Sequence, residues 1–130
     1  MTALLSDVFS ADGPLAAGVP GYRLRSQQLE LAERIAAAMA DNRVLVAEAG
    51  TGTGKTYAYL VPALLAGGKV IVSTGTRNLQ DQLFTRDIPT IRQALKSPVK
   101  VALLKGRANY LCHYHLARSL ADGRFLSRDD

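Results

Sequence analysis

The sequence predicts an α/β protein built on a parallel sheet of about three strands flanked by helices. Three short apolar segments, 43–48, 69–74 and 99–104, alternate with longer segments of helical periodicity. Strands separated by helices pair in parallel through right-handed crossovers. Each apolar segment is nearly continuous, as in strands that are covered on both faces. Together these observations indicate an α/β fold whose sheet is small for its class.

The first half of the chain is predicted to hold two helices. Residues 1–22 contain five glycines and prolines between positions 13 and 21, which predicts an irregular lead-in. A helix with apolar residues at three- and four-residue spacing runs over 26–40, with Ser26 as a suitable N-cap. A second helix runs over 55–66, and the two glycines that follow end it.

The second half is predicted to hold further helices. A helix over 77–87 follows the second strand and breaks at Ile88-Pro89, because the residue before a proline disfavours helical geometry. Pro89 then opens another helical stretch to about residue 96, since proline is tolerated in a first turn. A last helix is expected over 110–121.

Length and composition set the class of protein. The chain has 130 residues, which is room for one domain, and one cysteine, which excludes an internal disulfide and suits a reducing compartment. The first twenty residues lack the basic and long apolar stretches of a signal peptide. No apolar run approaches the roughly 20 residues of a membrane span. We therefore expect a cytoplasmic protein with no membrane contact.

The charge is concentrated in one part of the chain. Residues 1–41 hold three basic and five acidic side chains, whereas residues 42–130 hold thirteen basic and six acidic ones. A basic C-terminal two-thirds indicates a polyanionic partner such as a nucleotide or nucleic acid. A solvated basic surface without a partner is an equal alternative on charge alone.

The strongest functional signal is a loop rich in glycine and threonine between the first predicted strand and the second predicted helix. Its glycines let successive backbone N–H groups curl around an anion, and the helix directs its positive end at phosphates. Its lysine can reach the β- and γ-phosphates of a nucleotide, and the hydroxyl that follows can ligate Mg²⁺. The residues are Ala49, Gly50, Thr51, Gly52, Thr53, Gly54, Lys55 and Thr56.

One position departs from the strict phosphate-loop pattern, which begins with glycine where this chain has Ala49. Many nucleic-acid-dependent motors tolerate alanine there, whereas most GTPases and small-molecule kinases do not. A glycine-rich turn that only joins a strand to a helix is the structural alternative. The intact GTGTGKT run, placed between a predicted strand and a predicted helix, favours the phosphate loop.

A second polar turn lies where the strand 69–74 ends and the next helix begins. Its hydroxyls, its glycine and its arginine suit the phosphates of a nucleic-acid backbone, with no reading of bases. An ordinary N-capped helix explains the same segment equally well. The residues are Ser73, Thr74, Gly75, Thr76 and Arg77.

Three runs of residues resemble the N-terminal end of the DinG- and XPD-like helicases, and most of all the YoaA-type members of that group. They are EAGTGTGKTYAYLVPAL, VIVSTGTRNLQDQLFTRDIPT and VALLKGRANYLC, and the resemblance extends from about Asp12 to Leu116. These proteins are ATP-dependent DNA helicases of superfamily 2 that move 5′→3′ and carry an iron–sulfur cluster. The resemblance implies a partial RecA-like P-loop NTPase domain.

The resemblance also implies roles for particular residues. The loop 49–56 would be the Walker A motif, with Lys55 on phosphate and Thr56 on magnesium. Arg25 and Gln28 match the R-x-x-Q element that contacts the adenine, and a glutamine amide offers one donor and one acceptor to its edge. From the residues alone, Gln28 would be a polar residue on the exposed face of its helix. Residues 73–77 would be motif Ia, on the backbone of single-stranded DNA.

Cys112 ends a run that resembles the family's K-G-R-x-N-Y-x-C pattern, in which it would be the first of four cysteines that hold a [4Fe–4S] cluster. The cluster needs four thiolates and this chain has one. Zinc on Cys112, His113 and His115 is disfavoured because three ligands on one helical turn point in different directions. The expectation for this chain is a free, partly buried thiol. In a longer parent protein, Cys112 would bind the cluster.

The resemblance divides the chain into three parts. Residues 1–22 are the lead-in, residues 23–104 are the N-terminal part of the first RecA-like motor domain, and residues 105–130 are an incomplete iron–sulfur region. The D-E-A-H box that ligates magnesium does not occur in the sequence. We therefore expect this chain to be the N-terminal piece of a longer helicase that binds ATP or ADP but does not itself hydrolyse ATP. Its partners would be the nucleotide with Mg²⁺, single-stranded DNA and the remainder of the helicase chain.

Two other functions remain open from the sequence. A small nucleotide or metabolite kinase would need an acceptor site and lid arginines, and Ala49 together with the run STGTRNLQDQL speaks against it. A non-catalytic module would bind DNA or a protein through the basic part of the chain. Its binding would be indifferent to nucleotide and to the loss of Lys55.

Overall fold

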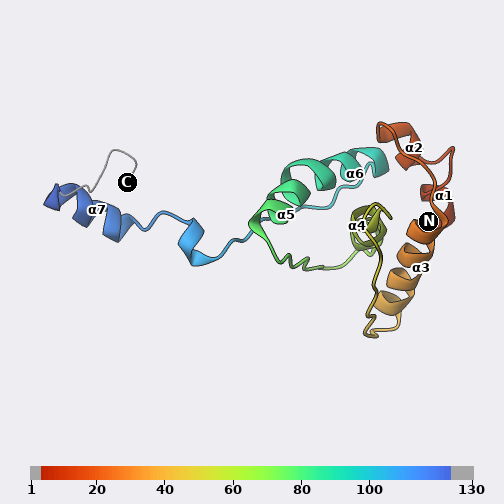
Figure 1. Ribbon diagram of the computed structural model, residues 1–130, viewed down its shortest axis with the longest axis horizontal. Helices are drawn as coiled ribbons and strands as arrows, with labels where there is room; N and C mark the ends of the chain where they lie inside the picture. The colour runs from red at the N-terminus through yellow and green to blue at the C-terminus, as the bar shows by residue number, and fades with distance from the viewer. Residues whose placement is uncertain (1–3, 124–130) are drawn as a thin grey trace. The chain divides into compact units, whose positions relative to one another are not determined.

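The computed structural model describes residues 4–123 and divides the chain into two compact units, Met1–Lys100 and Val101–Asp130. Most of its regular structure is helical (Figure 1). In chain order the elements are α1 (Leu5–Val8), α2 (Pro14–Gly18), α3 (Ser26–Ala40), α4 (Lys55–Leu65), α5 (Arg77–Gln82), the π-helical turn η1 (Leu83–Asp87), α6 (Ile88–Leu95), the 3₁₀ turn η2 (Arg107–Asn109) and α7 (His113–Asp122).

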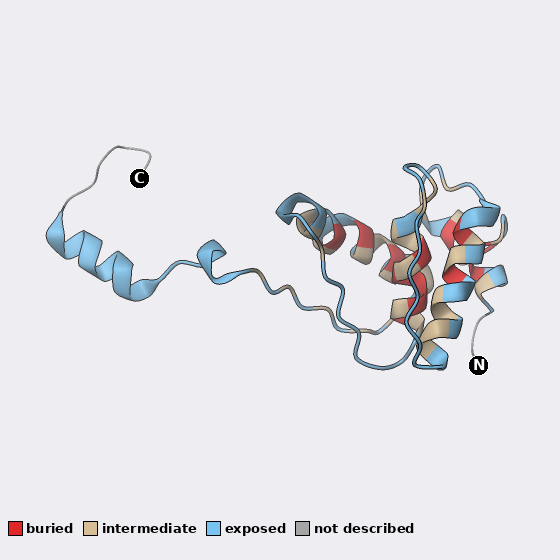
Figure 2. Ribbon diagram, turned by 60° about the horizontal axis from the view of Figure 1, so that its bottom comes forward, coloured by how far each residue is buried: buried red, intermediate tan, exposed pale blue. Residues whose placement is uncertain are grey.

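The hydrophobic core lies where the helices of the first unit meet. Helix α3 packs on α4 and α1, while α6 packs on α4 and α2. Figure 2 shows the buried residues gathered on the facing sides of these helices, whereas α7 is exposed along its length. The fully buried hydrophobic side chains come from segments far apart in the sequence, and the largest are Phe9, Leu15, Leu60, Ile91, Val8 and Val61.

The prediction of an irregular lead-in is wrong for residues 5–8 and 14–18, which form α1 and α2. Pro14 opens α2 in its first turn, where a proline costs no hydrogen bond. Phe9 and Leu15 are fully buried against the helices of the core. The lead-in is ordered because its apolar side chains are buried against the core helices. The glycines and prolines of the segment give no sign of this burial.

The central helices agree closely with the apolar pattern. Helix α3 has the predicted bounds, although its N-cap is Arg25 and Ser26 is its first residue. Helix α4 begins at Lys55 as predicted and ends one residue early. The backbone of Gly54 is left-handed at the N-terminus of α4, with φ of 80°. These helices follow the sequence closely because local periodicity and glycines determine them.

The predicted break at Ile88-Pro89 is wrong. Helices α5 and α6 are joined by the π-helical turn η1 into a continuous helical segment. Pro89 lies in the first turn of α6, where a proline is tolerated, and the π-helical turn comes directly before that helix. The segment ends at Leu95, after which Lys96 adopts a left-handed backbone with φ of 50°.

The predicted three-stranded sheet is not formed among residues 4–123. Segments 43–48, 69–74 and 99–104 carry no sheet pairing with one another. Val44 and Ile71 are 93% and 95% exposed, whereas their neighbours Leu45 and Val70 are 38% and 43% exposed. This alternation is that of strands with one face half covered and the other open. The RecA-like sheet therefore stays a prediction.

The second unit has little core of its own. Its residues from Gly106 to Gly123 are exposed. Helix α7 begins at His113, three residues later than predicted, because the turn η2 and a hydrogen bond from the Lys105 amide to the Tyr110 hydroxyl, 2.9 Å long, hold the preceding residues in another conformation. On α7, the rings of Tyr114 and His115 make an edge-to-face contact.

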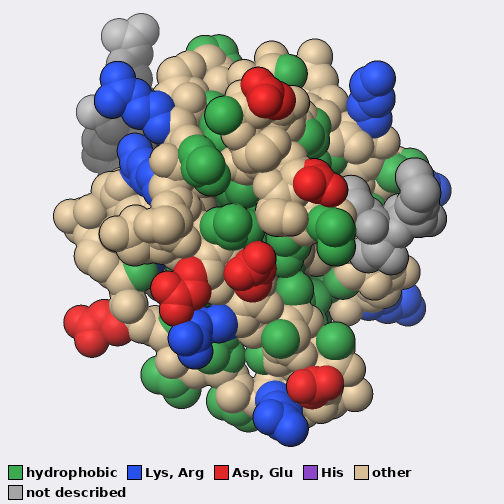
Figure 3. Space-filling view, turned by 90° about the vertical axis from the view of Figure 1, so that its right-hand side faces the viewer, with side chains coloured by type: hydrophobic (Ala, Val, Ile, Leu, Met, Phe, Trp, Pro, Cys, Tyr) green, Lys and Arg blue, Asp and Glu red, His purple; other side chains and the backbone are tan. Residues whose placement is uncertain are grey.

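Charged side chains of both signs share the face of the first unit on which α1, α2 and α3 lie (Figure 3). The ion pair between Arg34 and Glu30 on α3 is one exposed example, with 2.9 Å between its charged atoms. Such a mixed surface agrees with the small acidic excess of residues 1–41. In the part of the chain that the structure describes, no helix is long and apolar enough to cross a bilayer.

Candidate functional site

The loop 49–56 folds back on itself before α4 begins. Gly52 and Gly54 have φ of 77° and 80°, a backbone that side chains with a Cβ rarely adopt. The Thr53 hydroxyl donates to the Gly50 carbonyl at 2.8 Å, and Lys55 Nζ donates to the Ala49 carbonyl at 2.6 Å. The ammonium group is thereby held over the loop itself, where a phosphate oxygen would be a stronger partner than a carbonyl.

Two residues upstream of the loop are brought to it by the packing of α3 on α4. Gln28 is 5% exposed, and its Nε2 donates to the Gly54 carbonyl at 3.1 Å. The Arg25 guanidinium, on an exposed side chain, donates to the Gly52 carbonyl. The interpretation of Gln28 as an exposed polar residue is wrong. It lies one helical turn before the buried Ala32, and that spacing is the signal that could have placed it on the buried face.

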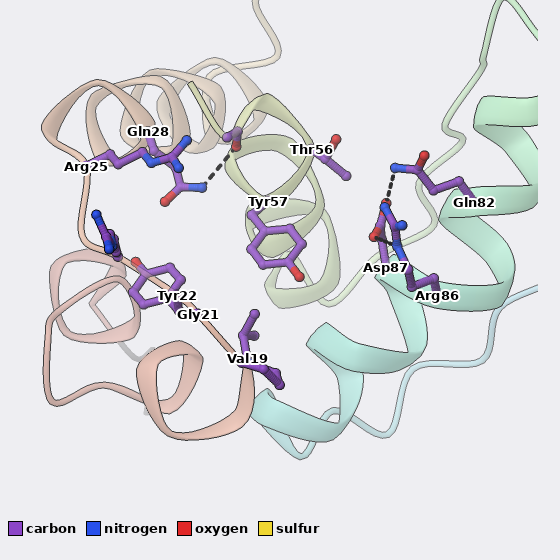
Figure 4. Close-up of a pocket in the computed structure, with 13 residues that line it drawn as sticks. Val19, Gly21, Tyr22, Arg25, Gln28, Thr56, Tyr57, Gln82, Arg86 and Asp87 are labelled. Atoms are coloured by element: carbon purple, nitrogen blue, oxygen red, sulfur yellow. Dashed lines mark hydrogen bonds and ion pairs between the residues drawn. The ribbon is translucent and has the colours of Figure 1, made fainter. Parts of the chain in front are cut away.

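A pocket of about 350 Å³ opens beside this contact. In Figure 4 the Tyr57 ring lies between one side of the pocket, formed by Arg25 and Gln28, and another, formed by residues of the α5–η1 segment. The volume falls in the range of small-molecule sites. Its lining combines aromatic, amide and guanidinium groups: Val19, Pro20, Gly21, Tyr22, Arg23, Arg25, Gln28, Gly54, Thr56, Tyr57, Gln82, Arg86 and Asp87.

The α5–η1 segment contributes three lining residues that the sequence did not single out. Asp87 is 5% exposed and accepts two hydrogen bonds, from Gln82 Nε2 to Oδ2 and from Arg86 Nε to Oδ1, both 3.0 Å long. An Arg-Asp pair in a helical segment is common in protein sequences, so no sequence signal marked these residues as part of a site. Their convergence on the pocket depends on the π-helical turn, and a π turn often marks a functional position in a helix.

The pocket is also lined by Tyr57, a tyrosine whose hydroxyl is harder to ionise than usual. Burial raises the pKa of Tyr57, and the nearby Asp87 carboxylate raises it further, against a smaller opposing effect of Arg86. Burial likewise raises the pKa of Tyr59, although a hydrogen bond with Thr56 opposes the shift. Both rings are therefore neutral near pH 7 and add no charge beside Thr56.

The turn 73–77 is an exposed N-cap structure. The Thr76 hydroxyl accepts a hydrogen bond from the Leu79 amide at 3.2 Å, and the Thr74 hydroxyl donates to the Thr76 carbonyl at 3.3 Å. Arg77 is exposed at the first position of α5. The turn therefore presents a cation and the N-terminal end of a helical segment on the surface.

Cys112 is a free thiol at the N-cap of α7, and it is exposed rather than partly buried as expected. The difference follows from the open packing around it, because every described residue from Gly106 onward is exposed. Among residues 4–123, no group of three or more His, Cys, Asp or Glu side chains is placed to hold a metal ion. The residues of this chain alone do not fit a four-thiolate cluster.

Comparison with known proteins finds related helicases. A family model described as "DEAD/DEAH box helicase" matches residues 27–113. "ATP-dependent DNA helicase YoaA" of Haemophilus influenzae is 53% identical over 119 residues, and that of Escherichia coli is 52% identical; each match covers 92% of this chain and 19% of the relative. "ATP-dependent helicase DinG" of Mycobacterium tuberculosis is 48% identical over 104 residues, 74% of this chain and 16% of the relative. No solved structure matches the chain significantly.

Proposed function

Because this chain belongs to the DEAD/DEAH box helicase family, we propose that it binds ATP with Mg²⁺ as the nucleotide-binding part of an ATP-dependent 5′→3′ DNA helicase. The observation that carries the proposal is the loop 49–56, whose Lys55 ammonium lies over left-handed glycines at the start of α4. The chain spans about a fifth of the length of the YoaA relatives, 19% in each. Unwinding of DNA would need a polypeptide as long as these relatives.

The phosphates, the magnesium ion and the edge of the adenine each have a partner in this arrangement. The loop N–H groups and Lys55 would hold the β- and γ-phosphates, and the Thr56 hydroxyl would ligate Mg²⁺, which neutralises phosphate charge. The Gln28 amide would recognise the adenine edge, because its Oε1 is buried without a protein hydrogen bond among the described residues. Arg25 would hold the loop through the Gly52 carbonyl. The chain would bind ATP or ADP without hydrolysing ATP, because the D-E-A-H sequence does not occur in it.

Two further roles extend the proposal beyond the nucleotide. The exposed turn 73–77 would contact the phosphates of single-stranded DNA. Cys112 would supply one thiolate of a [4Fe–4S] cluster in a longer helicase chain that contributes three more. The division into a lead-in (1–22), a RecA-like part (23–104) and an iron–sulfur region (105–130) belongs to the same proposal.

Replacing Lys55 with alanine is expected to weaken binding of MgATP by about 10- to 100-fold, because a charge-assisted hydrogen bond contributes about 1.5–3 kcal/mol. Titration calorimetry of the wild-type and variant chains measures the loss. Lys69→Ala is the matched control, since Lys69 is an exposed lysine outside the loop 49–56. Far-UV circular dichroism checks that both variants keep their helices.

Two results would contradict the proposal. A wild-type chain that is folded but shows no measurable affinity for MgATP or MgADP would exclude nucleotide binding. Equal affinities of the wild type and Lys55→Ala would show that the loop is only a connection between a strand and a helix. Binding of DNA that is indifferent to nucleotide would then favour a non-catalytic module.

The proposed DNA contact predicts a change in salt dependence. Replacing Arg77 with alanine removes one cation at the start of α5, so the slope of log affinity against log salt for a single-stranded oligonucleotide is expected to fall by about 0.7. Fluorescence anisotropy at several salt concentrations measures the slope. Arg34→Ala removes a cation from α3 and should leave the slope unchanged. Equal slopes for all three chains would remove Arg77 from the DNA interface.

A further inference from the structure

The nucleotide pocket has a second polar side that the proposed adenine and phosphate contacts do not use. Gln82, Arg86 and Asp87 form it, and Figure 4 shows them across the Tyr57 ring from Arg25 and Gln28. They belong to α5 and η1, a segment far in sequence from the loop and from α3. A ligand in the pocket would therefore be enclosed by groups from three separate parts of the first unit.

The two charged residues on this side of the pocket differ greatly in exposure. The Asp87 side chain is 6% exposed and the Arg86 side chain is 68% exposed, although the two are joined by a 3.0 Å contact. A buried carboxylate is costly unless it is paired and hydrogen-bonded, and Asp87 receives both Arg86 Nε and the Gln82 amide. Since the contact uses Nε, Asp87 fixes the direction of the guanidinium, while the Arg86 side chain stays largely exposed and lines the pocket.

A fixed guanidinium suits particular ligand groups. It is planar, carries its charge at every ordinary pH, stacks on aromatic rings and donates several hydrogen bonds in one plane. Lys55 and the loop N–H groups already serve the phosphates. Gln28 would take only the edge of the adenine, so the ribose and the rest of the base are what the side of the pocket opposite Gln28 would meet.

We propose that Arg86 contacts the base and ribose of the nucleotide and that Asp87 is the residue that positions it. This inference rests on the proposed function, since it names a contact of the same pocket. Arg86 would bind the nucleoside part on the side opposite Gln28. Asp87 would act only through Arg86, by holding Nε.

An exposed ion pair without function is the competing explanation for Arg86 and Asp87. Exposed pairs contribute little to stability, and both partners are usually solvated. Here one partner is nearly buried, both line a pocket, and the pair lies in a π-helical turn. The two explanations differ in what they predict for binding of the nucleoside part.

The test compares two ligands that share their phosphates. Affinities of the 130-residue chain for MgATP and for magnesium with inorganic tripolyphosphate are measured by calorimetry for the wild type, Arg86→Ala and the control Arg34→Ala. Arg86→Ala is expected to bind MgATP about tenfold more weakly, as for the loss of one charged contact, and to bind tripolyphosphate as the wild type does. Arg34→Ala should match the wild type for both ligands.

The outcomes separate this inference from the proposed function. If Lys55→Ala has a reduced affinity for MgATP but Arg86→Ala does not, the proposed nucleotide binding stands and the proposed role of Arg86 is overturned. If Arg86→Ala loses both ligands equally, Arg86 acts on the phosphates and the proposed contact with the nucleoside is wrong. If the folded wild type binds neither ligand, the proposed function fails and this inference with it.

The positioning role of Asp87 has its own measurement. Asp87→Asn keeps the shape of the side chain and removes its charge, and it is expected to weaken MgATP binding about threefold, less than Arg86→Ala. The double variant should bind MgATP no more weakly than Arg86→Ala alone, because Asp87 acts through Arg86. Additive losses would show instead that Asp87 acts independently of Arg86. Thermal melting curves establish that each variant is folded at the titration temperature.

Discussion

Replacing Phe9 with alanine is expected to lower the free energy of unfolding of the first unit by about 3–5 kcal/mol. Phe9 is 0% exposed, so its removal deletes buried apolar surface and leaves a cavity among packed helices. Its carbonyl also accepts the Tyr22 hydroxyl at 2.7 Å, which ties the lead-in to the pocket lining. Urea unfolding followed by far-UV circular dichroism measures the change.

Leu4→Ala provides the control for Phe9→Ala. Leu4 also lies in the lead-in, but its side chain is 66% exposed, and surface substitutions of this kind usually change stability by less than about 0.5 kcal/mol. If Phe9→Ala were no more destabilising than Leu4→Ala, residues 4–22 would not belong to the folded unit. The expectation of an irregular lead-in would then have been correct.

Replacing Gly54 with alanine is expected to destabilise the first unit by about 2–4 kcal/mol, from two sources. The left-handed backbone at φ of 80° costs about 1–2 kcal/mol for a residue with a Cβ. An added Cβ would also lie 2.1 Å from Gln28 Nε2, so it would force Gln28 out of its buried position. Affinity for MgATP should fall together with stability, because the loop and Gln28 move apart.

Gly67→Ala isolates the contribution of the backbone. Gly67 has φ of 73°, and nothing lies within 4 Å of the place where its Cβ would be. Urea unfolding of both variants therefore yields the backbone cost from Gly67→Ala and the steric cost from the difference. Adding Gln28→Ala to Gly54→Ala should recover part of that difference. Equal losses for Gly54→Ala and Gly67→Ala would mean that Gln28 does not pack against the loop.

The helices show how far local sequence reaches. The bounds of α3 were predictable, and so was the start of α4, because apolar spacing and the phosphate-loop glycines act within one element. The lead-in and the π-helical turn were not predictable in the same way. Phe9 and Leu15 are ordered by distant helices, and Pro89 continues a helix that the X-Pro rule would end.

The sheet shows a limit of the opposite kind. The apolar segments 43–48, 69–74 and 99–104 are typical of strands, yet no sheet pairing joins them among residues 4–123. A helix satisfies its backbone within its own segment, whereas a strand needs the N–H and C=O groups of another segment. The apolar pattern therefore predicts a tendency to form strands, but the described residues do not pair these segments into a sheet.

The sequence by itself determined which segment is the candidate phosphate loop, because the expected chemistry resides in consecutive residues: glycines that free the backbone, then Lys55 and Thr56 at the start of a helix. Only the tertiary structure decided what faces that loop. Gln28 reaches the Gly54 carbonyl because α3 packs on α4, and Arg86 and Asp87, hydrogen-bonded to each other within a π-helical turn, both line the pocket. Such contacts depend on the packing of distant segments, which local residue patterns do not specify.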